Sequence, residues 1–200
     1  MFKNMINKPA QTQVPIHELL QNRWSPRAFA KDRLIDDNMI VAMLEAARWS
    51  PSCMNEQPWR FVVCAKHQSE QVWQDLLGCL NEKNQIWAQH APLLLLAVSM
   101  NVFSHNDQPN RWANYDTGAA CLSLCLQASA LGLVSHQMGG FDVETCREKF
   151  GIPGNVTLMS VIAVGYQAEA DILPEDLRQR EQAERSRATV AERFFFGGWG

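Results

Sequence analysis

The sequence predicts a sandwich of strands and helices, of either the α/β or the α+β class. Short apolar runs of strand length alternate along the chain with longer segments whose apolar residues recur at helical spacing. The 200 residues, 46% of them hydrophobic, suffice for one sizeable core. Because no internal repeat, low-complexity segment or linker divides the chain, we expect residues 1–200 to form a single domain.

The first third of the chain is expected to hold two helices and a loop. Residues 14–23 predict a short helix, and Asp36 is a suitable N-cap for a second helix over about 37–49. The apolar face of the second helix is made at positions i, i+3, i+4 and i+7 by Ile40, Met43, Leu44 and Ala47. Residues 51–58 lie between two prolines and are rich in short polar side chains, which predicts a loop.

Four later segments have the length and apolar content of strands, and they are residues 59–65, 92–100, 133–138 and 156–166. The second of them is apolar throughout. This pattern is typical of a strand that is buried on both faces.

Helices are expected between these strands. Residues 66–90 have the pattern of one or two amphipathic helices. Residues 111–131 are apolar almost all round, which predicts a helix in a central position. Asp142 is a suitable N-cap for a further helix, which the glycines and proline of residues 151–155 end.

The last part of the chain, about 167–200, is polar until its aromatic end. The aromatic side chains there are Phe194, Phe195, Phe196 and Trp199. A polar arm has no core of its own in which to bury these rings, and exposing them would leave a large apolar patch. We therefore expect the arm to pack on a second subunit.

Charge and hydropathy exclude two classes of partner. The net charge is −3 and the pI is about 5.9, so no strongly basic face is expected to bind nucleic acid. The longest apolar stretch, 92–98, is much too short to span a bilayer, and the first residues lack the apolar run of a signal peptide. These features favour a soluble, cytoplasmic protein without a membrane partner.

The chain shows no standard catalytic or metal-binding motif. Its six cysteines form no C-x-x-C pair and have no metal-ligand spacing with the five histidines, so free and mostly buried thiols are expected. The histidines are spread over five segments with no nucleophile pattern beside them. Glycine-rich nucleotide motifs, H-E-x-x-H and G-x-S-x-G are also absent. We therefore assign no catalytic acid, base or nucleophile.

Four polar loops carry the side chains suited to binding: residues 23–27, 51–58, 137–140 and 184–187. Pro26 favours an extended chain in the first loop, so Arg23, Ser25 and Arg27 would point to one side. Arginines in the first and last loops suit an anion such as a phosphate.

The two middle loops suit a flat ring. Gly139 and Gly140 would let the backbone come close to a flat ligand, and Asn55 and Gln57 have hydrogen-bonding groups for the edge of a heterocycle. Each loop taken alone also fits an ordinary solvated loop. Together the four loops indicate a phosphorylated aromatic cofactor.

Five segments then match one family in its own order over nearly the whole chain. The two most specific are RWSPRAF at 23–29 and AARWSPSCMNEQPWRFVV at 46–63, and LGLVSHQMGGFD, VIAVGY and RSR follow. Through these motifs the sequence resembles the FMN-dependent nitroreductase family. Two departures lie at the phosphate end: Trp24 stands where members often have a second cation, and RSRATV replaces an Arg-x-Arg-Lys-Pro tail.

The resemblance implies a fold and an assembly. The expected fold is of the α+β class, with a mixed central sheet flanked by helices. The expected assembly is a domain-exchanged homodimer, with two non-covalently bound FMN molecules at the subunit interface and a C-terminal arm exchanged between partners.

The resemblance also implies roles for ten residues. Arg23 and Ser25 would hold the FMN phosphate with Arg185 and Arg187, and Arg27 would reach the pyrimidine end of the ring. The expected ring and ribityl contacts are Ser52 and Asn55 from the other subunit, Asn84, and the backbone N–H groups of Gly139 and Gly140 near flavin N5.

The implied reaction is a ping-pong transfer through FMN. NADH or NADPH gives a hydride to flavin N5 and leaves, and a nitroaromatic, a quinone or a similar small electron acceptor then takes its place. Two alternatives stay open. One is a specialised flavoenzyme of the same fold that fragments flavin, removes halogen or oxidises azolines; the other is a flavin-binding protein without enzymatic activity.

Overall fold

A four-stranded antiparallel sheet forms the centre of the protein in the computed structural model, which describes residues 5–199. The strands are β1 (Trp59–Ala65), β2 (Leu93–Met100), β3 (Val134–Met138) and β4 (Val156–Gly165), in the spatial order β1-β2-β4-β3. The expectation of a mixed sheet is wrong for the described residues of one chain. β2 and β3 run in the same direction, but β4 lies between them and pairs antiparallel with both.

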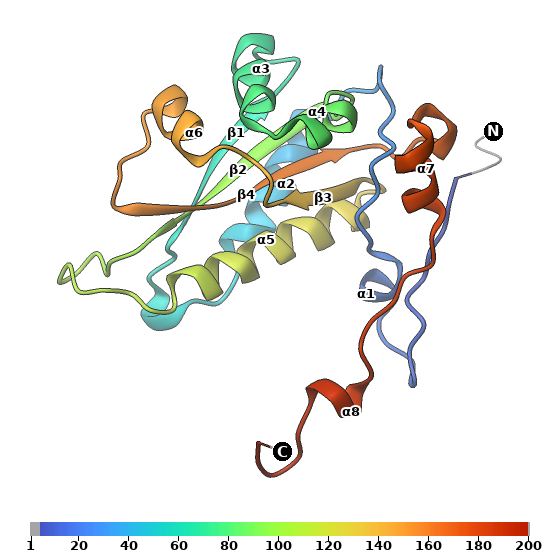
Figure 1. The fold of residues 1–200 in the computed structure, drawn as a ribbon. Helices are drawn as coiled ribbons and strands as arrows, with labels where there is room; N and C mark the ends of the chain where they lie inside the picture. Colours follow the sequence, from blue (N-terminus) through green and yellow to red (C-terminus); the bar gives the residue numbers. More distant parts are fainter. Residues whose placement is uncertain (1–4, 200) are drawn as a thin grey trace.

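Helices cover both faces of this sheet and make three layers (Figure 1). One face carries α2 (Asp37–Arg48) and α5 (Ala113–Ala130), and the other carries α3 (Glu70–Cys79), α4 (Glu82–Ala88) and α6 (Val143–Phe150). This arrangement fits the α+β class of the prediction.

The strand β2 separates two apolar cores. Its alternate side chains Leu93 and Leu95 pack toward α2 and α5, whereas Leu94 and Leu96 pack toward α3, α4 and α6. All four side chains are fully buried, so the prediction of a strand buried on both faces is confirmed. Close packing on both sides holds this strand firmly, and its neighbours with it.

Side-chain caps set the start of the predicted helices. Asp36 accepts a hydrogen bond from the N–H of Asn38 at α2, and Asp142 accepts one from the N–H of Thr145 at α6. At the other end of α6, Gly151 takes a left-handed conformation and ends the helix.

The long helix α5 is not central within one chain. Its inner face packs on α2 and the sheet, but Tyr115 is 80% exposed and Leu122 is also exposed on the outer face. The sequence predicts a central position because the helix is apolar almost all round. A single chain supplies cover for only one side of it.

The C-terminal part divides at residue 183. Residues 167–182 include α7 (Glu175–Gln182) and pack on the same chain, with Leu173 and Leu177 in the core. The exposed arm therefore begins at residue 183, not at the expected 167, and it projects away from the body with α8 (Val190–Arg193) near its end (Figure 1). Phe196 is 96% and Trp199 is 94% exposed.

Candidate functional site

The segment 23–29 is extended, as the proline predicts, and follows the short helix α1 (Glu18–Asn22). Ala28 and Phe29 anchor it in the core, and Phe29 forms a β-bridge with Gln167. One Arg23 guanidinium N–H reaches Ser25 Oγ at 3.4 Å, so these two side chains lie together as predicted. The buried end of the segment thus holds its polar start in place.

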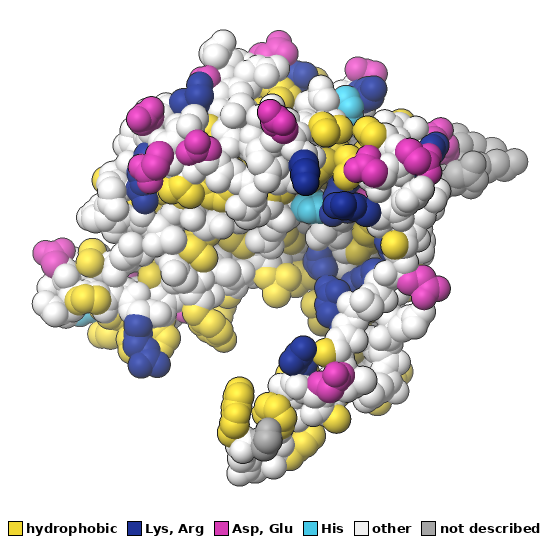
Figure 2. All heavy atoms as spheres, in the orientation of Figure 1, with side chains coloured by type: hydrophobic (Ala, Val, Ile, Leu, Met, Phe, Trp, Pro, Cys, Tyr) yellow, Lys and Arg dark blue, Asp and Glu magenta, His cyan; other side chains and the backbone are white. Residues whose placement is uncertain are grey.

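Arg23, Arg185 and Arg187 form a cationic group where the arm leaves the body. Arg185 donates to the carbonyls of Lys8 and Gln21 at 2.6 and 2.9 Å, which brings the arm beside α1. Dark-blue side chains gather at this junction in Figure 2.

The cationic group has the chemistry of an anion site. Burial lowers the pKa of Arg185, and the charges of Arg23 and Arg187 lower it further. Within residues 5–199, none of the three arginines forms an ion pair with a carboxylate. Like charges held together without a counter-ion favour binding of a dianion such as a phosphate monoester.

Lys8 adds a fourth cation beside Trp24, which is one of the two departures from the family pattern. Its ammonium group lies 4.6 Å from the centre of the Trp24 ring and donates to the Glu181 carbonyl at 2.9 Å. Burial lowers the pKa of Lys8, and the charge of Arg185 acts in the same direction. Lys8, from the N-terminal part of the chain, therefore places a cation beside Trp24, the residue that stands where members of the family often have a cation.

Arg27 turns to a different partner, the buried carboxylate of Glu181. A guanidinium nitrogen of Arg27 lies 3.8 Å from Glu181 Oε2, and the Arg27 N–H donates to the same carboxylate. No sequence signal identified Glu181, because it stands in the strongly polar helix EDLRQREQ.

His136 in β3 holds the same segment from the other side. Its Nδ1 lies 3.1 Å from the Pro26 carbonyl oxygen, and because a carbonyl only accepts, Nδ1 carries the proton. The imidazole packs on Trp87 with ring centres 4.6 Å apart. Burial lowers the pKa of His136 to about 4, and the nearby charges of Arg27 and Arg23 act in the same direction. The ring is therefore neutral at pH 7.

Gly139 and Gly140 follow β3 directly and lead toward α6, and we call this pair the glycine turn. A Cβ on Gly140 would lie 2.3 Å from the side chain of Asn81 and 3.0 Å from that of Asn84, so any larger residue there would displace these two side chains. The Asn84 amide donates to the Gly140 carbonyl at 3.1 Å. Asn84 thus holds the turn in place, and its expected contact with a ring stays a prediction.

Residues 52–57 form a strained loop. Met54, Asn55 and Gln57 all have a left-handed backbone, which costs about 1–2 kcal/mol for each such residue. Several hydrogen bonds hold the loop. The Cys53 N–H donates to Asp116 on α5, the Gln57 N–H donates to Ser52 Oγ, and the Ser104 N–H donates to the Glu56 carboxylate. Strain that is held in this way is common at binding sites.

The predicted residues do not meet in one place within a single chain. The strained loop, with Ser52 and Asn55, is tied to Asp116 in the first turn of α5. Cys125, more than two turns further along α5, accepts a hydrogen bond from Gln137, beside the glycine turn. At about 1.5 Å per residue, these two points on α5 are roughly 14 Å apart. Figure 1 shows the loop and α1 near opposite ends of α5.

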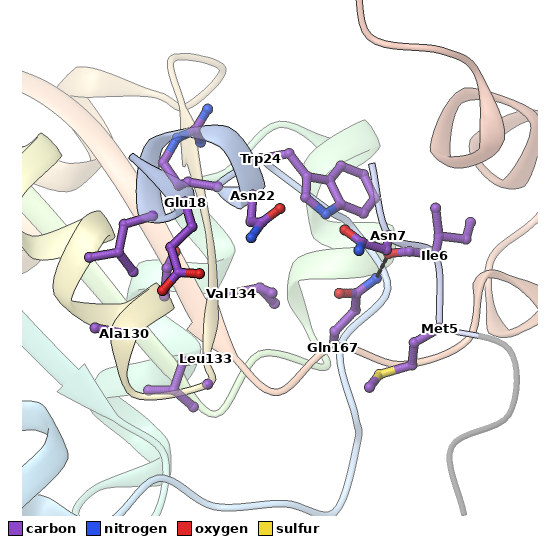
Figure 3. Close-up of a pocket in the computed structure, with 14 residues that line it drawn as sticks. Met5, Ile6, Asn7, Glu18, Asn22, Trp24, Ala130, Leu133, Val134 and Gln167 are labelled. Atoms are coloured by element: carbon purple, nitrogen blue, oxygen red, sulfur yellow. Dashed lines mark hydrogen bonds between the residues drawn. The ribbon is translucent and has the colours of Figure 1, made fainter. Parts of the chain in front are cut away.

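Three hollows border the predicted residues, and one of about 790 Å³ on the arm is lined by Arg187. A pocket of about 520 Å³ lies between residues 5–7, α1 and the end of α5 (Figure 3). Of the ten predicted residues, only Arg23 lines it. Another, of about 810 Å³, borders the glycine turn and Asn81.

The cysteines match the prediction of free thiols. All six are unpaired, and Cys53 alone is not buried. Among residues 5–199, no group of three or more His, Cys, Asp or Glu side chains is placed to hold a metal ion, and no helix is long and apolar enough to cross a membrane.

The sequence model of the Nitroreductase family matches residues 20–166, which is most of the chain. The chain belongs to the nitroreductase family. That span begins within α1 and ends just after β4, so it includes the entire sheet and the helices that cover it. The segment 23–27, the strained loop and the glycine turn of this nitroreductase-family chain also lie inside the matched region.

Three similar proteins illustrate the range of the family. A crystal structure described as an oxidoreductase containing FMN has a TM-score of 0.89 and 34% identity, with 98% of this chain and 99% of that chain covered. The NADH dehydrogenase of Thermus thermophilus is 26% identical and covers 74% of this chain and 84% of its own length. The iodotyrosine deiodinase of Thermotoga neapolitana is 28% identical, with 76% and 88% covered.

Proposed function

We propose that this nitroreductase-family chain binds FMN and acts as an NAD(P)H-dependent oxidoreductase that reduces nitroaromatics, quinones or similar acceptors. The cationic group carries the proposal, because three arginines without a counter-ion match the phosphate of FMN. The similar structure at 34% identity, described as containing FMN, supports the same cofactor.

The residues have distinct proposed tasks. Arg23, Ser25, Arg185 and Arg187 bind the phosphate, and Arg27 faces the pyrimidine end of the ring. The N–H groups of Gly139 and Gly140 face flavin N5, in a turn that Asn84 holds. Bound FMN supplies the electron-transfer chemistry, so the protein needs no acid, base or nucleophile of its own.

A homodimer is part of the proposal. The strained loop with Ser52 and Asn55 lies too far along α5 to complete the site of its own chain, so a second copy would supply it. Exposed Tyr115 on α5 and the exposed aromatic rings of the arm favour contact with such a copy.

Spectroscopy tests the cofactor and the activity together. Purified protein is expected to be yellow and to bleach anaerobically with NADH or NADPH, and comparing the two donors gives the preference. Steady-state turnover with menadione or nitrofurazone is expected. A colourless protein that does not take up added FMN would contradict the proposal, and FMN binding without turnover would leave a flavin-binding protein.

Reductive dehalogenation is the second candidate, because a relative covering most of this chain is named iodotyrosine deiodinase. Yellow protein that barely oxidises NAD(P)H, but releases iodide from iodotyrosine when reduced by dithionite, would favour it over the first.

A further inference from the structure

A buried carboxylate stands at the root of the C-terminal arm. Glu181, in the last turn of α7, is 1% exposed. Its Oε1 accepts the N–H groups of Arg27 and Ala28 at 2.8 and 3.1 Å, and its Oε2 lies 3.0 Å from the Arg27 nitrogen. The side chain therefore binds the backbone of the segment 23–29.

Three separate parts of the chain meet at this residue. The Glu181 carbonyl accepts a hydrogen bond from Lys8 at 2.9 Å, while its carboxylate holds Arg27 and Ala28. The N-terminal segment, the segment 23–29 and the root of the arm are thus fixed relative to one another. A shift of α7 would therefore move the backbone of Arg27 as well.

Apart from the second contact of the Arg27 N–H, to Oε2 at 3.0 Å, the hydrogen bonds of the carboxylate do not require a charge. A glutamine at the same position has an amide oxygen that accepts both N–H groups now bound by Oε1. Burying a carboxylate costs several kcal/mol unless it is well paired, and the Arg27 guanidinium stays 3.8 Å from it. Burial raises the pKa of the Glu181 carboxyl, and the N–H donors and the Arg27 charge oppose that rise. Hydrogen bonding to the backbone therefore does not explain why a charged carboxylate is buried at this position.

We infer that Glu181 is a positioning residue that sets the direction and the effective charge of Arg27, and through Arg27 the relative affinity for reduced and oxidised FMN. The inference rests on the proposed function, in which Arg27 faces the pyrimidine end of the ring. Reduced flavin carries negative charge there, and a cation beside it stabilises that form. A carboxylate behind the cation offsets part of this effect.

The test compares Glu181→Gln with Glu148→Gln, which removes one exposed carboxylate from α6. FMN dissociation constants come from fluorescence titration at pH 8, and the ratio of reduced to oxidised affinity comes from the flavin midpoint potential. Glu181→Gln is expected to raise this ratio about tenfold, which is about 30 mV for a two-electron couple. Glu148→Gln is expected to match the wild type.

A double-mutant cycle tests the route through Arg27. In an Arg27→Gln background, Glu181→Gln is expected to leave the ratio unchanged, because the charge that it modulates is gone. An equal effect in both backgrounds would overturn the inference. Should Glu181→Gln fail to fold, Glu181→Asp keeps the charge but shortens its reach, and the same cycle is measured with it.

The outcomes separate the two proposals. Wild-type protein that takes up FMN, with the same ratio in Glu181→Gln as in Glu148→Gln, contradicts the role of Glu181 and leaves the proposed function standing. Wild-type protein that takes up no FMN contradicts the proposed function, and the role of Glu181 with it.

Discussion

The carboxylate of Asp116 accepts a hydrogen bond from the backbone N–H of Cys53 at 3.0 Å, and so ties the strained loop to α5. Asp116 is buried. Asp116→Ala is expected to lower the free energy of unfolding by about 1–3 kcal/mol, because the Cys53 N–H loses its acceptor and the left-handed residues lose their support. Urea denaturation measures the change. Asp171→Ala, at an exposed aspartate, is the control, and an equal effect of both variants would rule out this role.

Arg23→Ala is expected to weaken FMN binding by about 1.5–3 kcal/mol, or roughly 10- to 150-fold, because a charge-assisted phosphate contact is lost. Fluorescence titration of the apoprotein with FMN gives the dissociation constant. Arg48→Ala removes the same charge from an exposed pair with Glu45 and is expected to have no effect on affinity. Unchanged FMN affinity in the Arg23 variant would remove Arg23 from the site.

Lys8→Met is expected to weaken FMN binding several-fold at low salt. The lysine stands over Trp24 near the cationic group, so its charge acts on the phosphate at a distance. Salt screens such an interaction, and the difference from the wild type should shrink as salt is added. Lys31→Met, at an exposed turn, is the matched control. A loss that is independent of salt would indicate that Lys8 acts by packing alone.

His136 is expected to make stability depend on pH. Its pKa is lowered to about 4 in the folded protein, whereas an unfolded histidine titrates near 6.5. Between these values the unfolded chain binds more protons, so stability falls as the pH drops from 6.5 toward 4. From pH 7 to pH 5 the loss from this group is about 2 kcal/mol, at about 1.4 kcal/mol for each pH unit below 6.5.

The measurement is urea denaturation of the apoprotein at pH 7 and pH 5, at one protein concentration. His136→Gln is expected to show a smaller fall in stability between the two pH values than the wild type. Parallel falls in both proteins would mean that His136 does not titrate in this way.

Local patterns predicted the elements of the fold well. The spacing of Ile40, Met43 and Ala47 identified α2, the caps Asp36 and Asp142 set two helix starts, and the unbroken apolar run of β2 indicated its double burial. Strand pairing joins residues far apart in the sequence, so no local sequence pattern indicated that β4 lies between β2 and β3.

The candidate site was predicted less fully. Arginines and glycines in loops have few roles other than solvation or binding, so Arg23, Arg185 and the glycine turn stood out. Glu181 looks like any acid of a polar helix, because its burial depends on how α7 docks. The sequence did contain a signal for Asp116, because it is the one acidic residue of the otherwise apolar helix α5.

Because the cationic group and the strained loop lie apart along α5, each copy of the chain in the proposed dimer would contribute to two different sites. In the proposed dimer, one site joins the cationic group of the first copy to the loop of the second, and the other site does the reverse. In a dimer of one Arg23→Ala copy and one Asp116→Ala copy, both substitutions would affect the same site, and the other site would have neither. Two impaired variants, unfolded together and reassembled, would therefore complement each other.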